Sequence, residues 1–339
     1  MDTLLKRTIQ LTTVAVCLVL VVVLLGGWTR LNDAGLGCPD WPGCYGEMVL
    51  PGSGAALQEA QARFPDQLID QKKGWLEMIH RYAAGSLGIL IAVLTWLGWR
   101  QRFRTGYPLM LSFGLLVLVT VQAAFGMWTV TLKLLPQVVT LHLLGGLLTL
   151  SLLVRLRQRL VSLREWTSTN VDRKPQRWVL IGLLILFMQL ALGGWTSANY
   201  AGWACTDWLQ CNTDAEVGLD FGRGFELMPE VGPNYEGGQL PVEARAAIQV
   251  THRVMAVLLL AYLFWLCWKL RFGSVGAVAQ VVVVIALIQL GLGVANIIWA
   301  LPLSLATAHH AGAVALLLSL LWLYERSGTY PQEVRDESA

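Results

Sequence analysis

Long apolar runs with at most one charged residue each recur along the chain and are separated by polar segments. Eight such runs occur, at residues 8–28, 78–99, 107–131, 136–154, 178–197, 246–268, 275–299 and 302–323. Each is close to the roughly 20 residues that cross a bilayer as an α-helix. The pattern therefore predicts an all-α integral membrane protein with eight transmembrane helices. The first run could instead be a signal peptide, but it is long for that role and no small-residue cleavage site follows it, so we expect a retained helix.

Charged residues are scarce, and the basic ones are unevenly placed. Of the 339 residues, 55% are hydrophobic and 14% are charged, whereas about a quarter is typical of soluble domains. The net charge of +3 gives no reason to expect nucleic-acid binding. Basic residues gather at alternate ends of the runs, at Lys6, Arg7, Arg100, Arg102, Arg104, Arg155, Arg157, Arg159, Arg164, Arg173, Lys174, Arg177, Lys269 and Arg271. The positive-inside rule then predicts a multi-pass protein of a bacterial inner membrane with both termini cytoplasmic.

The two halves of the sequence share a series of landmarks in the same order. In the first half these are Gly26-Gly27-Trp28-Thr29, Cys38, Cys44, His80-Arg81, Gln122, Gly126 and His142. In the second half they are Gly193-Gly194-Trp195-Thr196, Cys205, Cys211, His252-Arg253, Gln289, Gly293 and His309. Because four helices separate equivalent landmarks, the halves are expected to be parallel repeats, each a four-helix bundle. The predicted divisions are an N-terminal half 1–157, a basic cytoplasmic linker 158–177, a C-terminal half 178–326 and a polar tail 327–339.

Histidines supply the candidate chemistry, because all five lie in apolar runs, where ionisable groups are costly and usually functional. The repeat pairs His80 with His142 and His252 with His309, on the second and fourth helix of each half. At 1.5 Å rise per residue, all four lie about 5–11 Å below the outer ends of the apolar runs. Zinc or non-haem iron usually needs further Cys or carboxylate ligands, whereas haem needs only one or two axial ligands. The pairs therefore favour haem binding, and the alternative is a hydrogen bond from each histidine to a neighbouring helix.

Residues beside these histidines extend the predicted site. Arg81 and Arg253 could reach haem propionates near the outer surface, or their side chains could extend to lipid headgroups. His310 follows His309, but Leu143 occupies its equivalent place in the first half. We therefore take His309 as the ligand, although the sequence leaves the choice between the two open.

The halves differ at one position close to the predicted chemistry. Glu77 stands three residues before His80, and Gln249 stands three residues before His252. Residues three apart on a helix share a face, so we expect the Glu77 side chain to project toward the same slot as His80. A carboxylate there is suited to proton transfer or to stabilising a developing cation, which makes Glu77 the candidate catalytic residue. The alternative is an acid that merely favours a helix start.

Four cysteines form two pairs in the outward loops, Cys38 with Cys44 and Cys205 with Cys211. A disulfide closing each short loop is the simple expectation. A redox-active pair is the alternative for Cys38 and Cys44, whereas a structural role is favoured for the second pair.

Taken together, the ordered set resembles the haem A synthase family over about residues 8–325. The features that carry the resemblance are Glu77-Met78-Ile79-His80-Arg81, His142, His252-Arg253, His309, the paired cysteines and the repeated four-helix unit. The resemblance implies that His252 and His309 hold a haem b cofactor, whereas His80, His142 and Glu77 form the site for haem O. It also implies oxidation of a haem O methyl group to an alcohol and then to the formyl group of haem A, for use in cytochrome oxidase.

The sequence leaves several alternatives and partners open. A membrane b-type cytochrome with two haems, passing electrons from quinol, would use the same four histidines. The difference between Glu77 and Gln249 and the doubled cysteine loops favour catalysis instead. A thiol–disulfide oxidoreductase would leave the histidines unexplained, and a haem transporter is a further alternative. Haem O synthase and the assembly of cytochrome oxidase are candidate partners, whereas the electron acceptor, the oxygen source and a homo-oligomeric state are not fixed by the sequence.

Overall fold

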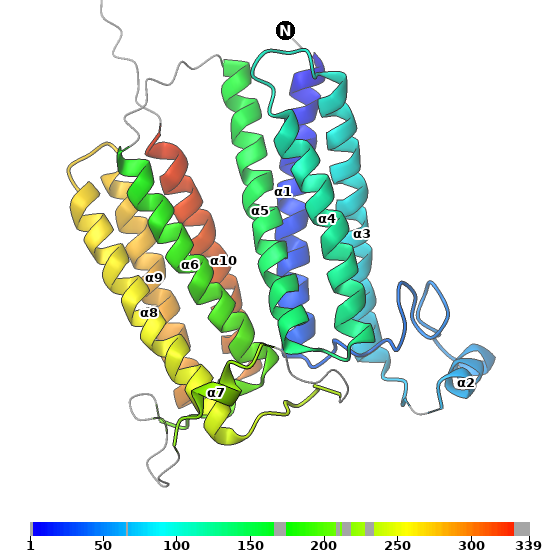
Figure 1. Ribbon diagram of the computed structural model, residues 1–339. Coiled ribbons are helices and arrows are strands. Elements are labelled where there is room, and N and C mark those ends of the chain that lie inside the picture. Colours follow the sequence, from blue (N-terminus) through cyan, green and yellow to red (C-terminus); the bar gives the residue numbers. More distant parts are fainter. Residues whose placement is uncertain are drawn as a thin grey trace, which may run out of the picture.

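Figure 1 shows the computed structural model, which describes residues 3–65, 67–165, 174–207, 211, 218–227 and 234–328. The secondary-structure elements within these residues are all helices. The elements are α1 (Thr3–Leu31), α2 (Gly54–Arg63), α3 (Gln71–Arg100), α4 (Leu109–Thr131), α5 (Pro136–Glu165), α6 (Lys174–Ala198), the 3-10 helix η1 (Ala201–Trp203), α7 (Phe221–Gly224), α8 (Val242–Leu270), α9 (Gly276–Ile298) and α10 (Leu303–Arg326).

The described residues contain eight helices long and apolar enough to cross a membrane, which confirms the predicted all-α class and the eight apolar runs. Several helices begin earlier than the runs do. Helix α3 starts at Gln71, where the Asp70 side chain caps it by accepting from the backbone N–H groups of Lys72 and Lys73. Because its first turns are polar, hydropathy alone could not detect them.

The early starts correct the expected depth of two histidines. His80 lies nine residues after Gln71, and His252 lies ten residues after Val242. At 1.5 Å rise per residue, both are about 14–15 Å from their helix starts. Counted from the starts of the apolar runs at residues 78 and 246, the depths are about 3 Å for His80 and about 9 Å for His252. The expected 5–11 Å therefore holds only for His252, and only from that boundary, because polar turns precede both runs.

The eight long helices lie in two groups of four (Figure 1). Within one group α1 contacts α3 and α5, and α4 contacts the same two helices; within the other, α6 contacts α8 and α10, and α9 contacts the same two. The groups meet where α5 contacts α6 and where α1 contacts α10. The turns before α5 and α10 also match, because both contain two successive residues with positive φ, Lys133-Leu134 and Ala300-Leu301.

Helix also covers much of the stretch expected to link the halves. Helix α5 continues to Glu165 and α6 begins at Lys174. Residues 166–173, between these helices, and the tail from 329 lie outside the described residues. The long connections that carry α2 and α7 lie at the end of the molecule opposite to the N-terminus (Figure 1).

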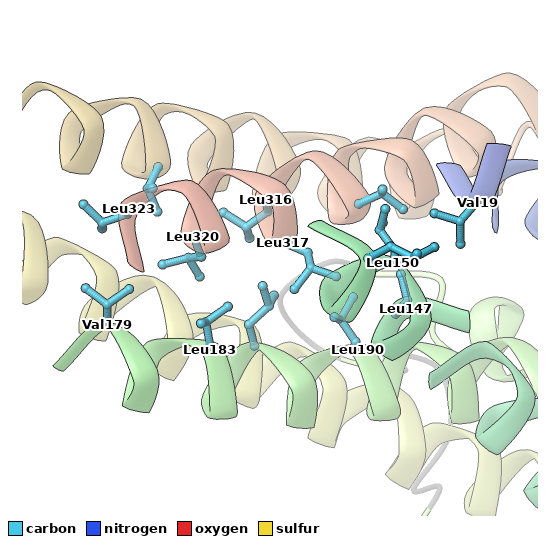
Figure 2. Packing of buried hydrophobic residues seen from close by; sticks show 14 of the residues in the cluster. Val19, Leu147, Leu150, Val179, Leu183, Leu190, Leu316, Leu317, Leu320 and Leu323 are labelled. Carbon is cyan, nitrogen blue, oxygen red and sulfur yellow. The ribbon is translucent and has the colours of Figure 1, made fainter. Parts of the chain in front are cut away.

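A cluster of buried apolar side chains, many of them leucines, runs through the interiors of both groups and joins them. Figure 2 shows part of this cluster, to which α5 contributes leucines at a spacing of three to four residues that keeps them on one face. The fully buried leucines of α5 and α10 are Leu147, Leu150, Leu153, Leu156, Leu160, Leu316, Leu317, Leu320 and Leu323. Since lipid tails are as apolar as leucine, close packing rather than escape from water must stabilise this contact.

Polar contacts also join the two groups. The Arg155 guanidinium on α5 forms an ion pair with Glu325 on α10. Toward the other end, Arg30 donates to the Ser197 carbonyl, and its guanidinium lies 4.1 Å from the centroid of the Tyr200 ring. Each contact pairs one half with the other, so the two bundles are fixed relative to each other at both ends.

We predict that Leu150→Ala lowers the free energy of unfolding by on the order of 2 kcal/mol, because it leaves a cavity in this cluster. Leu148, two residues earlier on α5, is 39% exposed, whereas Leu150 is fully buried. Leu148→Ala should therefore change stability by less than about 0.5 kcal/mol. Thermal unfolding of both variants in the same detergent measures the difference, and equal losses would show that the cluster is not tightly packed.

Candidate functional site

The structure brings together the two histidines predicted in the first half. The ring centroids of His80 on α3 and His142 on α5 are 6.4 Å apart, and the ring planes are 85° apart. Two metal–nitrogen bonds of about 2 Å each would place the centres of two coordinating imidazoles about 6 Å apart. The observed spacing therefore suits two imidazoles that share one metal centre.

The histidines of α3 and α8 rest against glycines of the neighbouring first helix of each half. A Cβ atom built on Gly26 would lie 3.0 Å from Cε1 of His80, and one on Gly193 would lie 3.3 Å from Cε1 of His252. A larger side chain at either glycine would push the ring away, because such contacts are already close. These glycines belong to the repeated Gly-Gly-Trp-Thr landmark, whose contact with the histidines the sequence did not reveal.

The histidines of α5 and α10 rest on glycines in the same way. A Cβ atom built on Gly126 of α4 would lie 3.4 Å from Cε1 of His142, and one on Gly293 of α9 would lie 3.3 Å from Cε1 of His309. His309 is also close enough to His252 for their rings to interact electrostatically. Each half thus holds its two imidazoles between glycine-bearing helices at equivalent positions.

His309 and His310 point into different parts of the molecule. His309 lies against Gly293 within the second half, as described above. The Nε2 atom of His310 lies 3.2 Å from the main-chain carbonyl of Val23 on α1, and its ring covers Gly27. His310 is therefore a contact between the halves, whereas His309 faces Gly293 and Gln289 of its own half.

Buried polar atoms without a hydrogen-bond partner gather around both histidine pairs. Among the described residues, such atoms in the first half include Nδ1 of His80 and of His142 and Oε1 of Gln122. In the second half they include Nδ1 of His309 and Oε1 of Gln189 and Gln289. Buried polar groups are normally paired, so these atoms fit a site whose partners come from a bound group. Two imidazoles per site are the axial ligands that a haem iron can take.

Gln189 is a residue near the second site that the sequence did not single out. Its Nε2 atom lies 3.1 Å from Nδ1 of His252 and 3.2 Å from the main-chain carbonyl of His252. Gln189 stands four residues before Gly193, and Val22 stands four residues before Gly26. An alignment of the two halves could therefore have found this difference.

Glu77 lies beneath the loop closed by the Cys38–Cys44 disulfide. Its side chain is buried, and Oε2 accepts a hydrogen bond of 2.9 Å from the backbone N–H of Cys38. Its other oxygen, Oε1, accepts from the Arg81 guanidinium one turn later on α3. The carboxylate therefore connects the start of the loop to the helix that carries His80.

Each arginine that follows a histidine holds the loop of its own half. Arg81 donates to the carbonyls of Asp40 at 2.9 Å and Pro42 at 3.3 Å, and also to that of Gly43. Arg253 donates to the carbonyl of Asp207 at 2.9 Å, which is the repeat equivalent of Asp40. The predicted contacts of these arginines to propionates stay a prediction.

Both predicted disulfides are present, Cys38–Cys44 and Cys205–Cys211, with Cα–Cα distances of 4.8 Å and 4.4 Å. In the second half, Gln249 takes the place of Glu77 and donates to the Gly202 carbonyl at 3.1 Å.

Burial raises the pKa of Tyr45, which packs inside the first loop, and the Glu77 carboxylate adds to this increase. Tyr45 therefore stays neutral at neutral pH.

Comparison with known proteins agrees with this arrangement. The model of the COX15-CtaA family, described as cytochrome oxidase assembly protein, matches residues 9–321. The chain belongs to this family. It is 40% identical over 304 residues to the heme A synthase of Shewanella oneidensis, covering 89% of this chain and 91% of that protein. It is 29% identical to the heme A synthase of Rhizorhabdus wittichii, covering 90% and 89% of the two chains.

Substitutions at two glycines of α9 test whether this COX15-CtaA family member needs the glycine–histidine contacts to bind haem. Gly293 supports His309, whereas a Cβ atom at Gly291 would meet nothing within 4 Å. Gly293→Val should displace the ring and lower bound haem roughly tenfold, since small displacements of a ligating group are costly. Gly291→Val should leave the haem content unchanged. Soret absorbance per purified protein measures both, and equal haem in the two variants would contradict the contact's role.

Proposed function

We propose that this protein is the oxidising enzyme of haem A synthesis, converting the substrate haem O into haem A. The observation that carries the proposal is the pair of histidine sites in a chain 40% identical to a heme A synthase. A multi-pass membrane protein of this family has direct access to a lipid-soluble haem. The proposed enzyme class is an oxidoreductase, because conversion of a methyl to a formyl group is an oxidation.

The halves take different roles in this proposal. The first half, 1–157, would bind haem O at His80 and His142, because it alone carries a carboxylate, Glu77, one turn before the first histidine. The second half, 178–326, would hold haem b at His252 and His309. When bound there, haem b supplies a centre that accepts and passes on single electrons.

The reaction on haem O proceeds in two oxidations. Conversion of methyl to alcohol takes the oxygen atom of a water molecule and releases two electrons and two protons, and conversion of alcohol to aldehyde releases two more of each. An electron acceptor outside the chain takes up the four electrons, and the protons pass to water. Glu77 would stabilise the cationic carbon formed when electrons leave or would accept a proton from water. A carboxylate has about four acceptor positions, so the bonds from Cys38 and Arg81 leave it able to accept another.

The orientation in the membrane follows the same proposal. The disulfide loops and the N-terminus lie at opposite ends of the molecule (Figure 1). Disulfides persist in oxidising compartments, so the loops would face outward in a bacterial inner membrane and both termini would be cytoplasmic. The haem sites then lie toward the outer face. Haem O synthase and oxidase assembly are proposed partners, and the electron acceptor is not assigned.

Replacement of Glu77 tests the catalytic role. Glu77→Gln should keep the fold and the bound haem, because Gln249 is accommodated at the equivalent position, but should lower conversion of haem O at least about a hundredfold. Pigment extracted from cells that supply haem O measures the ratio of haem A to haem O. Glu236→Gln removes another acidic side chain, paired with Lys73, and should leave this ratio unchanged. Normal haem A production by Glu77→Gln would end the catalytic assignment.

Replacement of single histidines tests the division of roles. In cells that supply haem O, His252→Ala should lose haem b selectively, whereas His80→Ala should lose haem O and haem A and retain haem b. The reason is that removing one axial ligand weakens only the site to which it belongs. Chromatography of the extracted haems distinguishes the two patterns. Loss of the same haem from both variants would contradict the assignment of one haem type to each half.

A further inference from the structure

Arg81 occupies an unusual position, because its guanidinium is shared between the proposed catalytic carboxylate and the disulfide loop. It bonds to Oε1 of Glu77 and to the carbonyls of Asp40, Pro42 and Gly43. The side chains of Arg81 and Glu77 are 11% and 6% exposed. A guanidinium presents five N–H donors in a fixed planar fork, so one side chain can fix the carboxylate and the loop at once.

Comparison with Arg253 in the second half shows which contacts of Arg81 are specific to the first half. Arg253 holds the Asp207 carbonyl just as Arg81 holds that of Asp40. Support of the loop is therefore common to both halves. The equivalent of Glu77 is Gln249, which carries no charge and bonds to Gly202. The charge-assisted bond of Arg81 to a carboxylate one turn earlier therefore has no equivalent at Arg253, because the residue one turn before it is the uncharged Gln249.

We propose that Arg81 is a positioning residue that acts through Glu77, holding its carboxylate in a fixed orientation below the Cys38–Cys44 loop. This inference rests on the proposed function. It assigns Arg81 a role in the rate of conversion rather than in haem affinity, because both of its Nη atoms already face protein acceptors, Nη1 the loop carbonyls and Nη2 the Glu77 carboxylate. Without the guanidinium, a buried carboxylate would lose its cationic partner and either take up a proton or reorient.

The test compares Arg81→Gln and Arg81→Lys with the wild-type protein in membranes of a host that makes no haem A of its own. Haem O is titrated into the membranes, and haem A formation is expressed per folded, haem-loaded protein. Arg81→Gln should lower the maximal rate about a hundredfold, as expected for loss of a preorganised donor, while half-saturation by haem O changes less than twofold. Arg81→Lys should recover part of the rate, because it keeps the charge but not the fork. Arg63→Gln, which removes an exposed arginine paired with Glu59, should behave as wild type.

A double variant separates action through Glu77 from an independent effect. If Arg81 acts through Glu77, Glu77→Gln with Arg81→Gln should be no slower than Glu77→Gln alone. A rate that falls by the product of the two single effects would overturn the inference. So would Arg81→Gln with an unchanged maximal rate and weakened haem O binding, which is the result expected of a propionate contact.

Failure of the proposed function gives a different result. A wild-type protein that forms no haem A, or a Glu77→Gln variant that forms it normally, would reject the proposed function whatever Arg81 does. If Arg81→Gln yields too little folded protein, Arg81→Lys carries the test, and a Lys variant with full rate and unchanged half-saturation would also overturn the inference.

Discussion

The close contact between an imidazole ring and a glycine backbone is the interaction on which the two sites depend. An imidazole within the apolar layer is costly unless its polar atoms find partners. Here His80, His142, His252 and His309 each occupy the space left by a missing side chain on an adjacent helix. The glycines let two helices approach while a ring fits between them, so each pair converges without opening the bundle. Nδ1 of three of these rings has no protein partner among the described residues, which is the condition in which a ring is available to a metal.

Comparison of the two halves explains why a carboxylate can be present in only one of the two sites. Both halves use an arginine to hold the carbonyl of an equivalent aspartate, Asp40 or Asp207, so the loop support does not need a carboxylate. A buried carboxylate adds a desolvation cost, which its partners must offset. In the first half Glu77 has this desolvation cost, and the Arg81 guanidinium and the backbone N–H of Cys38 offset it. The second half has the uncharged Gln249 there and avoids this cost.

Sequence patterns predicted the features that depend on local hydropathy or spacing, and missed those that depend on contacts between distant residues. The apolar runs and the paired cysteines were enough for the eight helices and both disulfides. The bond from Cys38 to Glu77 spans 39 residues, so no local pattern contains it. Because Glu77 and His80 share a helix face, the sequence predicted that Glu77 lies on the same side of its helix as His80. The orientation of its carboxylate, however, depends on the bond from the loop. His309 and His310 could not be separated by sequence alone, because adjacent helical residues differ only by about 100° in direction.

Helix α1 contacts both histidine-bearing parts of the molecule at the boundary between the halves. Successive glycines of α1 serve different halves, since Gly26 lies under His80 and Gly27 lies under His310. His310 is adjacent to His309 on α10, so α1 contacts a residue of one histidine pair and the neighbour of the other. The leucine cluster and the Arg155–Glu325 pair hold these helices together. A displacement of α1 that moved His80 would therefore press on α10 next to His309, and a rigid interface keeps the spacing between the two histidine sites fixed.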